Sequence, residues 1–338
     1  MTLIKKKKEI YPINESLQKF LIAYKKEVQI PISYTDLTRY TSSINLYDKK
    51  GEDTLWQTVF YSSADMTEIY DGLKKIYAII RANGDLSVMQ HLYVDRVDLC
   101  SYGNTQPFRV RIVNQINDNY DYFYIKQADA SRVYGLELED MISPNRMNYI
   151  THNQTLIEDH IAGIPGYQFM KERLDDLDFN KIRLAKEFVK FNERCFVRLL
   201  GDMHSNNFVI DITPDFEEVH YRIRAIDFDQ QSFEGRRAVY MPQFFKENNP
   251  IIQLGIDMMT PTTVQQYQKE ERSLMAQRVK ASLHSIKDLL KAMRKEPIAP
   301  KENVVQLREE LAHFYKNDKF LKARNMGSIL QTSLEMLF

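Results

Sequence analysis

Three polar side chains are spaced in a way that suits metal and phosphate chemistry. Asp202 and Asn207 lie in a short polar loop, GDMHSNN, between two apolar runs, and Asp227 follows a later apolar run. Residues 208–212 and 220–226 have the composition of strands, and we expect them to form an antiparallel hairpin. The outer ends of a hairpin lie side by side, so the three side chains should converge. Two carboxylates and one amide oxygen are hard ligands that suit Mg²⁺.

The loop also has a simpler interpretation. Asp and Asn are common in turns because their side chains bond to nearby backbone groups, and for the loop alone both interpretations have equal weight. His204 lies in the same loop, and we interpret it as a packing residue rather than a base or a ligand. A metal hydrolase built on Asp202, His204 and Asp227 is disfavoured because the loop holds a single histidine.

Upstream of the loop, apolar residues alternate with the period of strands. Residues 91–100, 108–116 and 120–128 predict three antiparallel strands, with a tight turn at 117–119. Lys126 lies near the end of the third strand. A lysine in an apolar strand is costly to bury unless a partner compensates its charge. Lys126 is therefore a further candidate for chemistry.

The rest of the chain divides into a β-rich first half and a helical second half. A strand at 54–61 precedes the meander, and a helix at 131–142 and a hairpin from 147–150 and 155–161 follow it. The glycines and the proline of 162–166 predict a connector, because they suit neither helix nor strand. Apolar stripes with a helical period predict that most of the remaining chain is helical. The fold class is therefore α+β.

Several helix ends carry recognisable signals. Asn14 is expected to cap a helix that continues through Tyr24, and Asp178 or Asn180 is expected to cap a later one. Asn83 and Gly84 are expected to end the helix that precedes the meander, since both favour a left-handed cap.

The order of these features resembles a known family. The pattern G-D-x-H-x-x-N, a hairpin and then I-D-F resembles the catalytic centre of the protein-kinase-like superfamily. It is most similar in style to the aminoglycoside and choline phosphotransferase branch, whose loop reads H-G-D-x-x-x-x-N. The resemblance extends over about residues 90–230, and the family's lysine on the third strand falls on Lys126.

The resemblance implies a bilobal fold with an antiparallel five-stranded N-lobe and a mainly helical C-lobe, with the nucleotide held between them. The corresponding division of the chain is an N-terminal strand and helix cap at 1–85, a kinase-like N-lobe at 86–161 and a helical C-lobe at 162–338. The C-lobe would carry the catalytic and metal-binding loops.

The resemblance also implies roles for the polar residues. Asp202 would be the catalytic base, and Asn207 and Asp227 would hold Mg²⁺ on the phosphates of ATP. Asp229 stands where the family has the glycine of D-F-G, and it would take a second metal or face solvent. Lys126 would contact the α- and β-phosphates.

Further nucleotide-binding candidates come from three segments. The helix after Lys126 would supply the acidic partner of that lysine, and the loop between the first two strands would cover the phosphates. The backbone of the hinge would pair with adenine. These candidates are Glu137, Glu139, Ser101, Gly103, Glu158, Asp159 and His160. The choice between Glu137 and Glu139 stays open.

Two further positions depart from the family pattern. Leu200 stands where the family has a histidine that supports the loop, and the strand-connecting loop SYGNTQP has one glycine in place of G-x-G-x-x-G. Both departures favour a non-catalytic nucleotide-binding or scaffold protein of the same fold, whereas the joint presence of Lys126, Asp202, Asn207 and Asp227 favours an enzyme.

Composition limits the partners and the compartment. The 46 basic and 46 acidic residues balance, so no global field would attract nucleic acid or a membrane. We find no apolar run of about 18 residues that would predict a membrane span and no signal-peptide pattern. The two cysteines, Cys100 and Cys195, are too few for a structural zinc site of their own and predict reduced thiols in the cytoplasm.

These observations predict an ATP- and Mg²⁺-dependent phosphotransferase that moves the γ-phosphoryl group to a hydroxyl. We favour a small-molecule acceptor, because the connector and the loop resemble that branch. A non-catalytic pseudokinase is the main alternative. A protein kinase or an enzyme that transfers AMP with the same fold is less favoured.

Overall fold

The computed structural model describes residues 8–82, 84–174, 180–216 and 219–338. The chain forms two compact units. The sheet unit comprises Glu9–Ala130 and Met147–His160, and the helical unit comprises Ser131–Arg146 and Ile161–Phe338 together with Lys8. The chain therefore passes between the two units at 8/9, 130/131, 146/147 and 160/161, whereas the predicted divisions lay at 85/86 and 161/162. Asp178 and Asn83, two of the expected helix-end residues, lie outside the described residues.

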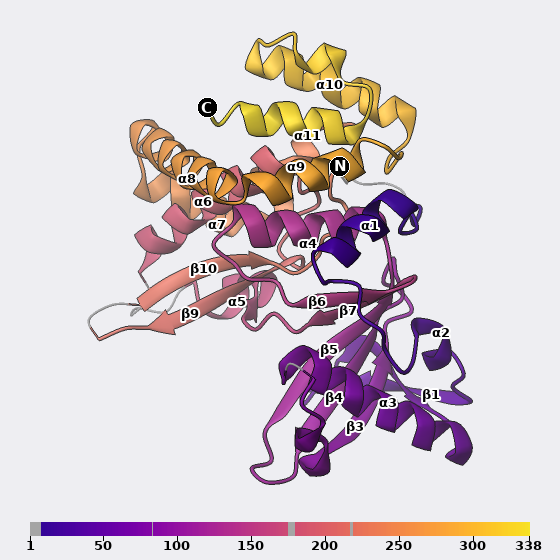
Figure 1. The fold of residues 1–338 in the computed structure, drawn as a ribbon. Helices are drawn as coiled ribbons and strands as arrows, with labels where there is room; N and C mark the ends of the chain where they lie inside the picture. Colours follow the sequence, from indigo (N-terminus) through magenta and orange to yellow (C-terminus); the bar gives the residue numbers. More distant parts are fainter. Residues whose placement is uncertain (1–7, 83, 175–179, 217–218) are drawn as a thin grey trace. The chain divides into compact units, whose positions relative to one another are not determined.

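The sheet unit contains one antiparallel sheet with seven strands, in the order β1-β2-β3-β4-β5-β7-β6 (Figure 1). The three predicted meander strands and the predicted hairpin after the helix are confirmed as β3, β4, β5, β6 and β7. The strands are β1 (Ser42–Tyr47), β2 (Asp53–Phe60), β3 (Leu92–Leu99), β4 (Phe108–Asn114), β5 (Tyr120–Gln127), β6 (Tyr149–His152) and β7 (Thr155–Asp159).

The prediction of a five-stranded sheet is wrong, because the hairpin of β1 and β2 extends it. β2 pairs with β3 through Gln57 opposite Leu99 and Thr58 opposite Asp98. β1 reads SSINLY, in which only Ile44 and Leu46 alternate with polar residues, and this short alternation was not predicted as a strand. The strand is almost entirely exposed. Its stabilisation comes from backbone pairing with β2, which a pattern of side chains does not report.

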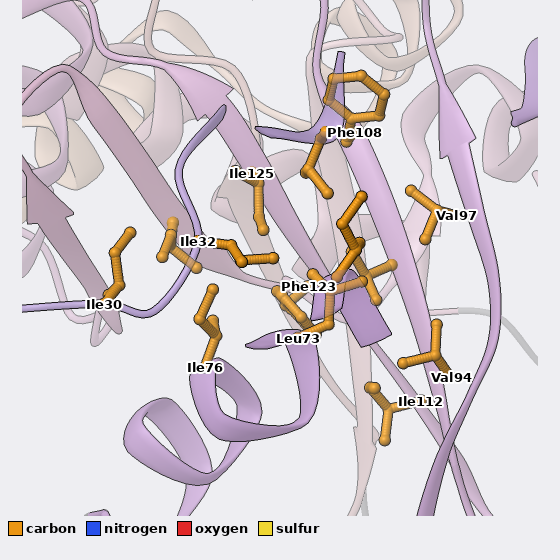
Figure 2. Close-up of a cluster of buried hydrophobic side chains, with 14 of the residues drawn as sticks. Ile30, Ile32, Leu73, Ile76, Val94, Val97, Phe108, Ile112, Phe123 and Ile125 are labelled. Carbon is orange, nitrogen blue, oxygen red and sulfur yellow. The ribbon is translucent and has the colours of Figure 1, made fainter. Parts of the chain in front are cut away.

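The core of the sheet unit lies between one face of the sheet and the helix α3 (Ser63–Arg81). Figure 2 shows Leu73 and Ile76 of α3 among Ile32 and the strand residues of this face, such as Phe123. The unit also contains α1 (Glu15–Ala23), α2 (Tyr34–Leu37) and the 3₁₀ helix η1 (Leu86–His91). The Asn14 side chain accepts from the Leu17 N–H, so the predicted cap of α1 is confirmed.

The helical unit consists mostly of helices packed around α6, which contacts α7, α8, α11 and the strand β10. The predicted helix at 131–142 is confirmed as α4. The α-helices are α4 (Ala130–Ile142), α5 (Gly166–Glu172), α6 (Lys181–Arg198), α7 (Asn249–Met258), α8 (Pro261–Ala281), α9 (Leu283–Met293), α10 (Lys301–Tyr315) and α11 (Met326–Glu335). The 3₁₀ helices are η2 (Arg237–Tyr240), η3 (Pro242–Phe244), η4 (Lys246–Asn248) and η5 (Phe320–Lys322).

The helical unit also holds a small antiparallel sheet in the order β10-β9-β8. The predicted hairpin is confirmed as β9 (Phe208–Pro214) and β10 (Val219–Ala225), and Asn180 caps α6 as expected. The third strand, β8 (Ile164–Pro165), corrects the prediction that 162–166 is only a connector. Its two residues pair with Ile210 and Val209 of β9.

A search of the described residues finds no helix with the length and apolar character needed to cross a membrane.

Candidate active site

The polar loop begins where α6 ends in a left-handed turn. Leu199 has φ +57° and caps α6, and Asp202 has φ +63°. A left-handed conformation is uncommon for a residue other than glycine, although Asp tolerates it better than most. Two backbone hydrogen bonds hold the loop, because the Gly201 N–H donates to Gln230 O at 3.2 Å and the Asp202 N–H donates to Val239 O at 3.1 Å.

The hairpin brings Asn207 next to the segment that carries Asp227. Phe208 pairs with Ala225 at the open end of the hairpin, and the Ile226 N–H donates to Asn207 O at 3.0 Å. The Asn207 Nδ2 atom donates to the Asp202 backbone carbonyl at 2.8 Å and lies 3.5 Å from Asp202 Oδ2. The structure thus brings Asp202, Asn207 and Asp227 together.

Arg132 is a member of this site that we did not single out from the sequence. Its guanidinium is buried, and Nη1 donates to Asp227 Oδ1 and to Asp229 Oδ1, both at 2.9 Å. Nη2 donates to Ile226 O at 3.2 Å. The sequence carried one signal, because Arg132 lies in the first turn of α4, where a basic residue opposes the helix dipole unless an anion compensates it.

The carboxyl group of Asp202 titrates far above its ordinary range. Burial and the nearby charges of Asp227, Glu234, Glu247 and Asp229 raise the pKa of Asp202 to about 7. The site therefore has a surplus of negative charge, and it carries a carboxyl that exchanges a proton near neutral pH.

The donor set of this site fits a divalent cation that is completed by other ligands. Asp227, at 35% side-chain exposure, offers a carboxylate, and Asn207 offers an amide. Within the described part of the chain, no group of three or more His, Cys, Asp or Glu side chains is arranged as a metal centre. Mg²⁺ is commonly bound by a few protein oxygens, while phosphate oxygens and water complete its coordination.

His204 has the surroundings of a packing residue. Its Nδ1 atom accepts from the Asn206 N–H at 3.3 Å, and its ring lies 6.1 Å from that of Phe245. Burial lowers the pKa of His204, although the charges of Glu247 and Asp227 act in the opposite direction. A neutral imidazole held in this way suits the support of the loop.

In the sheet unit, Lys126 is buried and forms an ion pair across neighbouring strands. Its Nζ donates to Glu158 Oε2 at 2.8 Å, and both side chains are 9% exposed. Glu158 was expected to contribute backbone groups of a hinge, and the register of β5 and β7 places its side chain beside Lys126. This diagonal relation depends on strand register, which the sequence pattern did not predict.

Glu139, one of the two glutamates proposed for Lys126, has its own partners within the helical unit. One carboxylate oxygen accepts from Ser143 Oγ and Asn145 Nδ2, both at 2.6 Å, and the other contacts the guanidinium of the buried Arg198. Glu137 is also buried.

The other predicted nucleotide-binding residues lie in the sheet unit. The Asp159 N–H donates to Asn148 O at 3.0 Å, and the His160 N–H donates to Asp159 Oδ1 at 2.9 Å, so both hinge donors are engaged. Ser101 is exposed in the turn between β3 and β4, where the Gly103 N–H donates to Cys100 O at 3.3 Å.

Comparisons with known proteins add little to this geometry. No family model matches the chain, and no curated protein matches it. A solved structure described as "Titin kinase and its flanking domains" matches this chain with 12% identity and a TM-score of 0.27. The match covers 72% of this chain and 54% of the chain in that structure. The chain thus spans about half the length of that structure. The observed fold is α+β, and the assignment of function rests on the residues of the site.

Proposed function

We propose that this protein is a phosphotransferase that moves the γ-phosphoryl group of ATP to a hydroxyl of a small-molecule acceptor, with Mg²⁺ as cofactor. The observation that carries the proposal is the convergence of Asp202, Asn207 and Asp227 at the open end of the β9–β10 hairpin. A metal hydrolase that uses His204 is not supported, because the His204 ring is hydrogen-bonded within the loop itself.

The Asp202 carboxyl is suited to the proton transfer that this reaction needs. As the acceptor oxygen bonds to the γ-phosphorus, the bond from that phosphorus to the leaving oxygen of ADP breaks, and the proton of the acceptor hydroxyl must go to a base. A general base works best when its pKa lies near the operating pH, and the pKa of Asp202 is about 7.

Charge neutralisation supplies most of the remaining catalysis. We assign Asn207 and Asp227 to Mg²⁺, which when bound neutralises charge on the phosphate oxygens. We assign Lys126 of the sheet unit to the α- and β-phosphates. The Lys126–Glu158 pair would keep the ammonium in place before nucleotide arrives.

The first test is the melting temperature with and without ATP and Mg²⁺. A ligand that binds only the folded state raises stability with the logarithm of its concentration over Kd. We expect a magnesium-dependent rise in the wild type that is lost in Asp227→Ala and kept in the control Asp215→Ala, whose side chain is exposed in the same hairpin. No rise at millimolar ATP would favour the scaffold interpretation.

The second test identifies the transferred group. The protein is incubated with hydroxyl-bearing metabolites and with ATP labelled at either the γ- or the α-phosphate. We expect γ-label in the product and none in Asp202→Asn, which should still bind ATP. Transfer of α-label would instead establish an AMP transferase, and near-normal turnover by Asp202→Asn would overturn the assignment of the base.

A further inference from the structure

The carboxylates at the end of the hairpin already hold one positive charge. Arg132 Nη1 lies 2.9 Å from Oδ1 of Asp227 and 2.9 Å from Oδ1 of Asp229, so a single nitrogen bridges the two carboxylates. The Arg132 side chain is only 3% exposed, and an arginine stays protonated under all ordinary conditions. This charge is therefore a permanent part of the site.

The two bridged carboxylates differ in how far their side chains are exposed. The Asp227 side chain is 35% exposed, whereas that of Asp229 is 11% exposed. The Asp229 N–H also donates to Asp227 Oδ1 at 3.0 Å, so this one oxygen accepts from both Arg132 and the backbone. Asp227 therefore retains Oδ2 for a ligand on its open side, while Asp229 faces Arg132.

The position of Arg132 indicates how many metal ions this arrangement accepts. Its guanidinium already lies between the carboxylates of Asp227 and Asp229, where a bridging cation would have to bind. A second divalent ion bridging Asp227 and Asp229 would have to occupy the position of the guanidinium and would be repelled by it.

Resting on the proposed function, we propose that Arg132 replaces one of two metal ions in this site. The protein binds one divalent cation through Asp227 and Asn207, and Asp229 serves to hold Arg132. Arg132 is a positioning residue, because its bonds to Asp227, Asp229 and Ile226 O fix the Asp-Phe-Asp segment in the absence of any metal.

The test is the stoichiometry of Mn²⁺ binding to the full chain, measured without nucleotide from the loss of the free-ion signal in electron paramagnetic resonance. We expect one Mn²⁺ per wild-type chain and two per Arg132→Met chain, since the variant removes the guanidinium that lies between the two carboxylates. A single ion in a folded Arg132→Met protein would overturn the inference, as would two ions in the wild type.

A second variant decides the question if Arg132→Met does not fold. Asp229→Asn should weaken Mn²⁺ binding by less than about threefold, because Asp229 is not a ligand, whereas Asp227→Asn should weaken it by more than tenfold. A loss greater than threefold in Asp229→Asn would make Asp229 a ligand and overturn the inference. If the wild type bound no Mn²⁺ at millimolar concentration, the metal site of the proposed function would fail as well. Two ions in the wild type would leave that function intact.

Discussion

Asp202 combines a left-handed backbone with a carboxyl whose pKa burial and neighbouring carboxylates raise to about 7. Because the folded state binds this proton more tightly than the unfolded chain, the protein loses stability as pH rises from about 4 to about 7. Such a group costs stability at neutral pH, which is a common property of functional sites. Measuring this loss of stability tests the electrostatic environment of Asp202 independently of any role in a reaction.

Asp202→Asn should therefore stabilise the metal-free protein at high pH. We expect its free energy of unfolding to exceed that of the wild type by about 1–3 kcal/mol at pH 8, with the difference shrinking as pH falls toward 4. Urea unfolding in EDTA at several pH values measures this, with Asp215→Asn as the control. An Asp202→Asn protein that is less stable than the wild type at pH 8 would contradict the raised pKa.

Lys126 and Glu158 form a buried candidate for a coupled pair in the sheet unit. The Lys126 Nζ and Glu158 Oε2 atoms are 2.8 Å apart and both side chains are 9% exposed, so removal of one partner deprives a buried charge of this ion pair. We expect Lys126→Met and Glu158→Gln each to cost about 3–5 kcal/mol, and the double variant to cost about 1–3 kcal/mol less than their sum.

A double-mutant cycle by urea unfolding measures this coupling. The ion pair between Lys74 and Asp71 on α3 is a matched control, because its atoms are 2.7 Å apart but its side chains are 24% and 55% exposed. Its coupling should stay below about 0.5 kcal/mol. Equal coupling in the two pairs would mean that burial does not strengthen the Lys126–Glu158 pair.

At the scale of elements, the glycine that precedes the strand β8 lets the backbone approach β9 closely. Gly163 has φ +150°, and a Cβ atom there would lie 2.7 Å from Val209 Cγ2 and 3.2 Å from Ile210 O of β9. Gly163→Ala should destabilise the protein by about 1–3 kcal/mol through backbone strain and this clash. Gly51→Ala is the control, since Gly51 has φ +81° but open space around it, and it should cost only about 1 kcal/mol. Thermal or urea unfolding compares them, and equal losses would exclude the clash.

The elements that sequence predicted best are those with a strong apolar period. The strands around Phe123 and the helix that contains Leu73 were found because one face of each is buried. β1 and β8 were missed because the apolar alternation of β1 is short and exposed, and the Ile-Pro pair of β8 carries no period. At the site, the hairpin argument placed Asp202, Asn207 and Asp227 together, whereas Arg132 and Glu158 entered through tertiary packing and strand register that no local pattern contains.

At the scale of the whole molecule, residues before 86 belong to the core of the sheet unit. Nine buried residues of its apolar cluster come from this part of the chain, among them Ile32, Val59 and Leu73. Each buried apolar side chain contributes roughly 1.5–3 kcal/mol, so together they match or exceed the roughly 5–15 kcal/mol that separates folded from unfolded domains. A chain of residues 86–338 should therefore leave the sheet unit unfolded, whereas residues 9–338 should retain it.

Limited proteolysis and hydrogen exchange of the two shortened chains test this expectation. In the shorter chain, the amides of β3, β4 and β5 should exchange within minutes, because the face that packs on Leu73 and Ile76 is left uncovered. In residues 9–338 these amides should keep the protection of the full chain. Protected strands in 86–338 would show that the first 85 residues are a separable cap on an independent sheet.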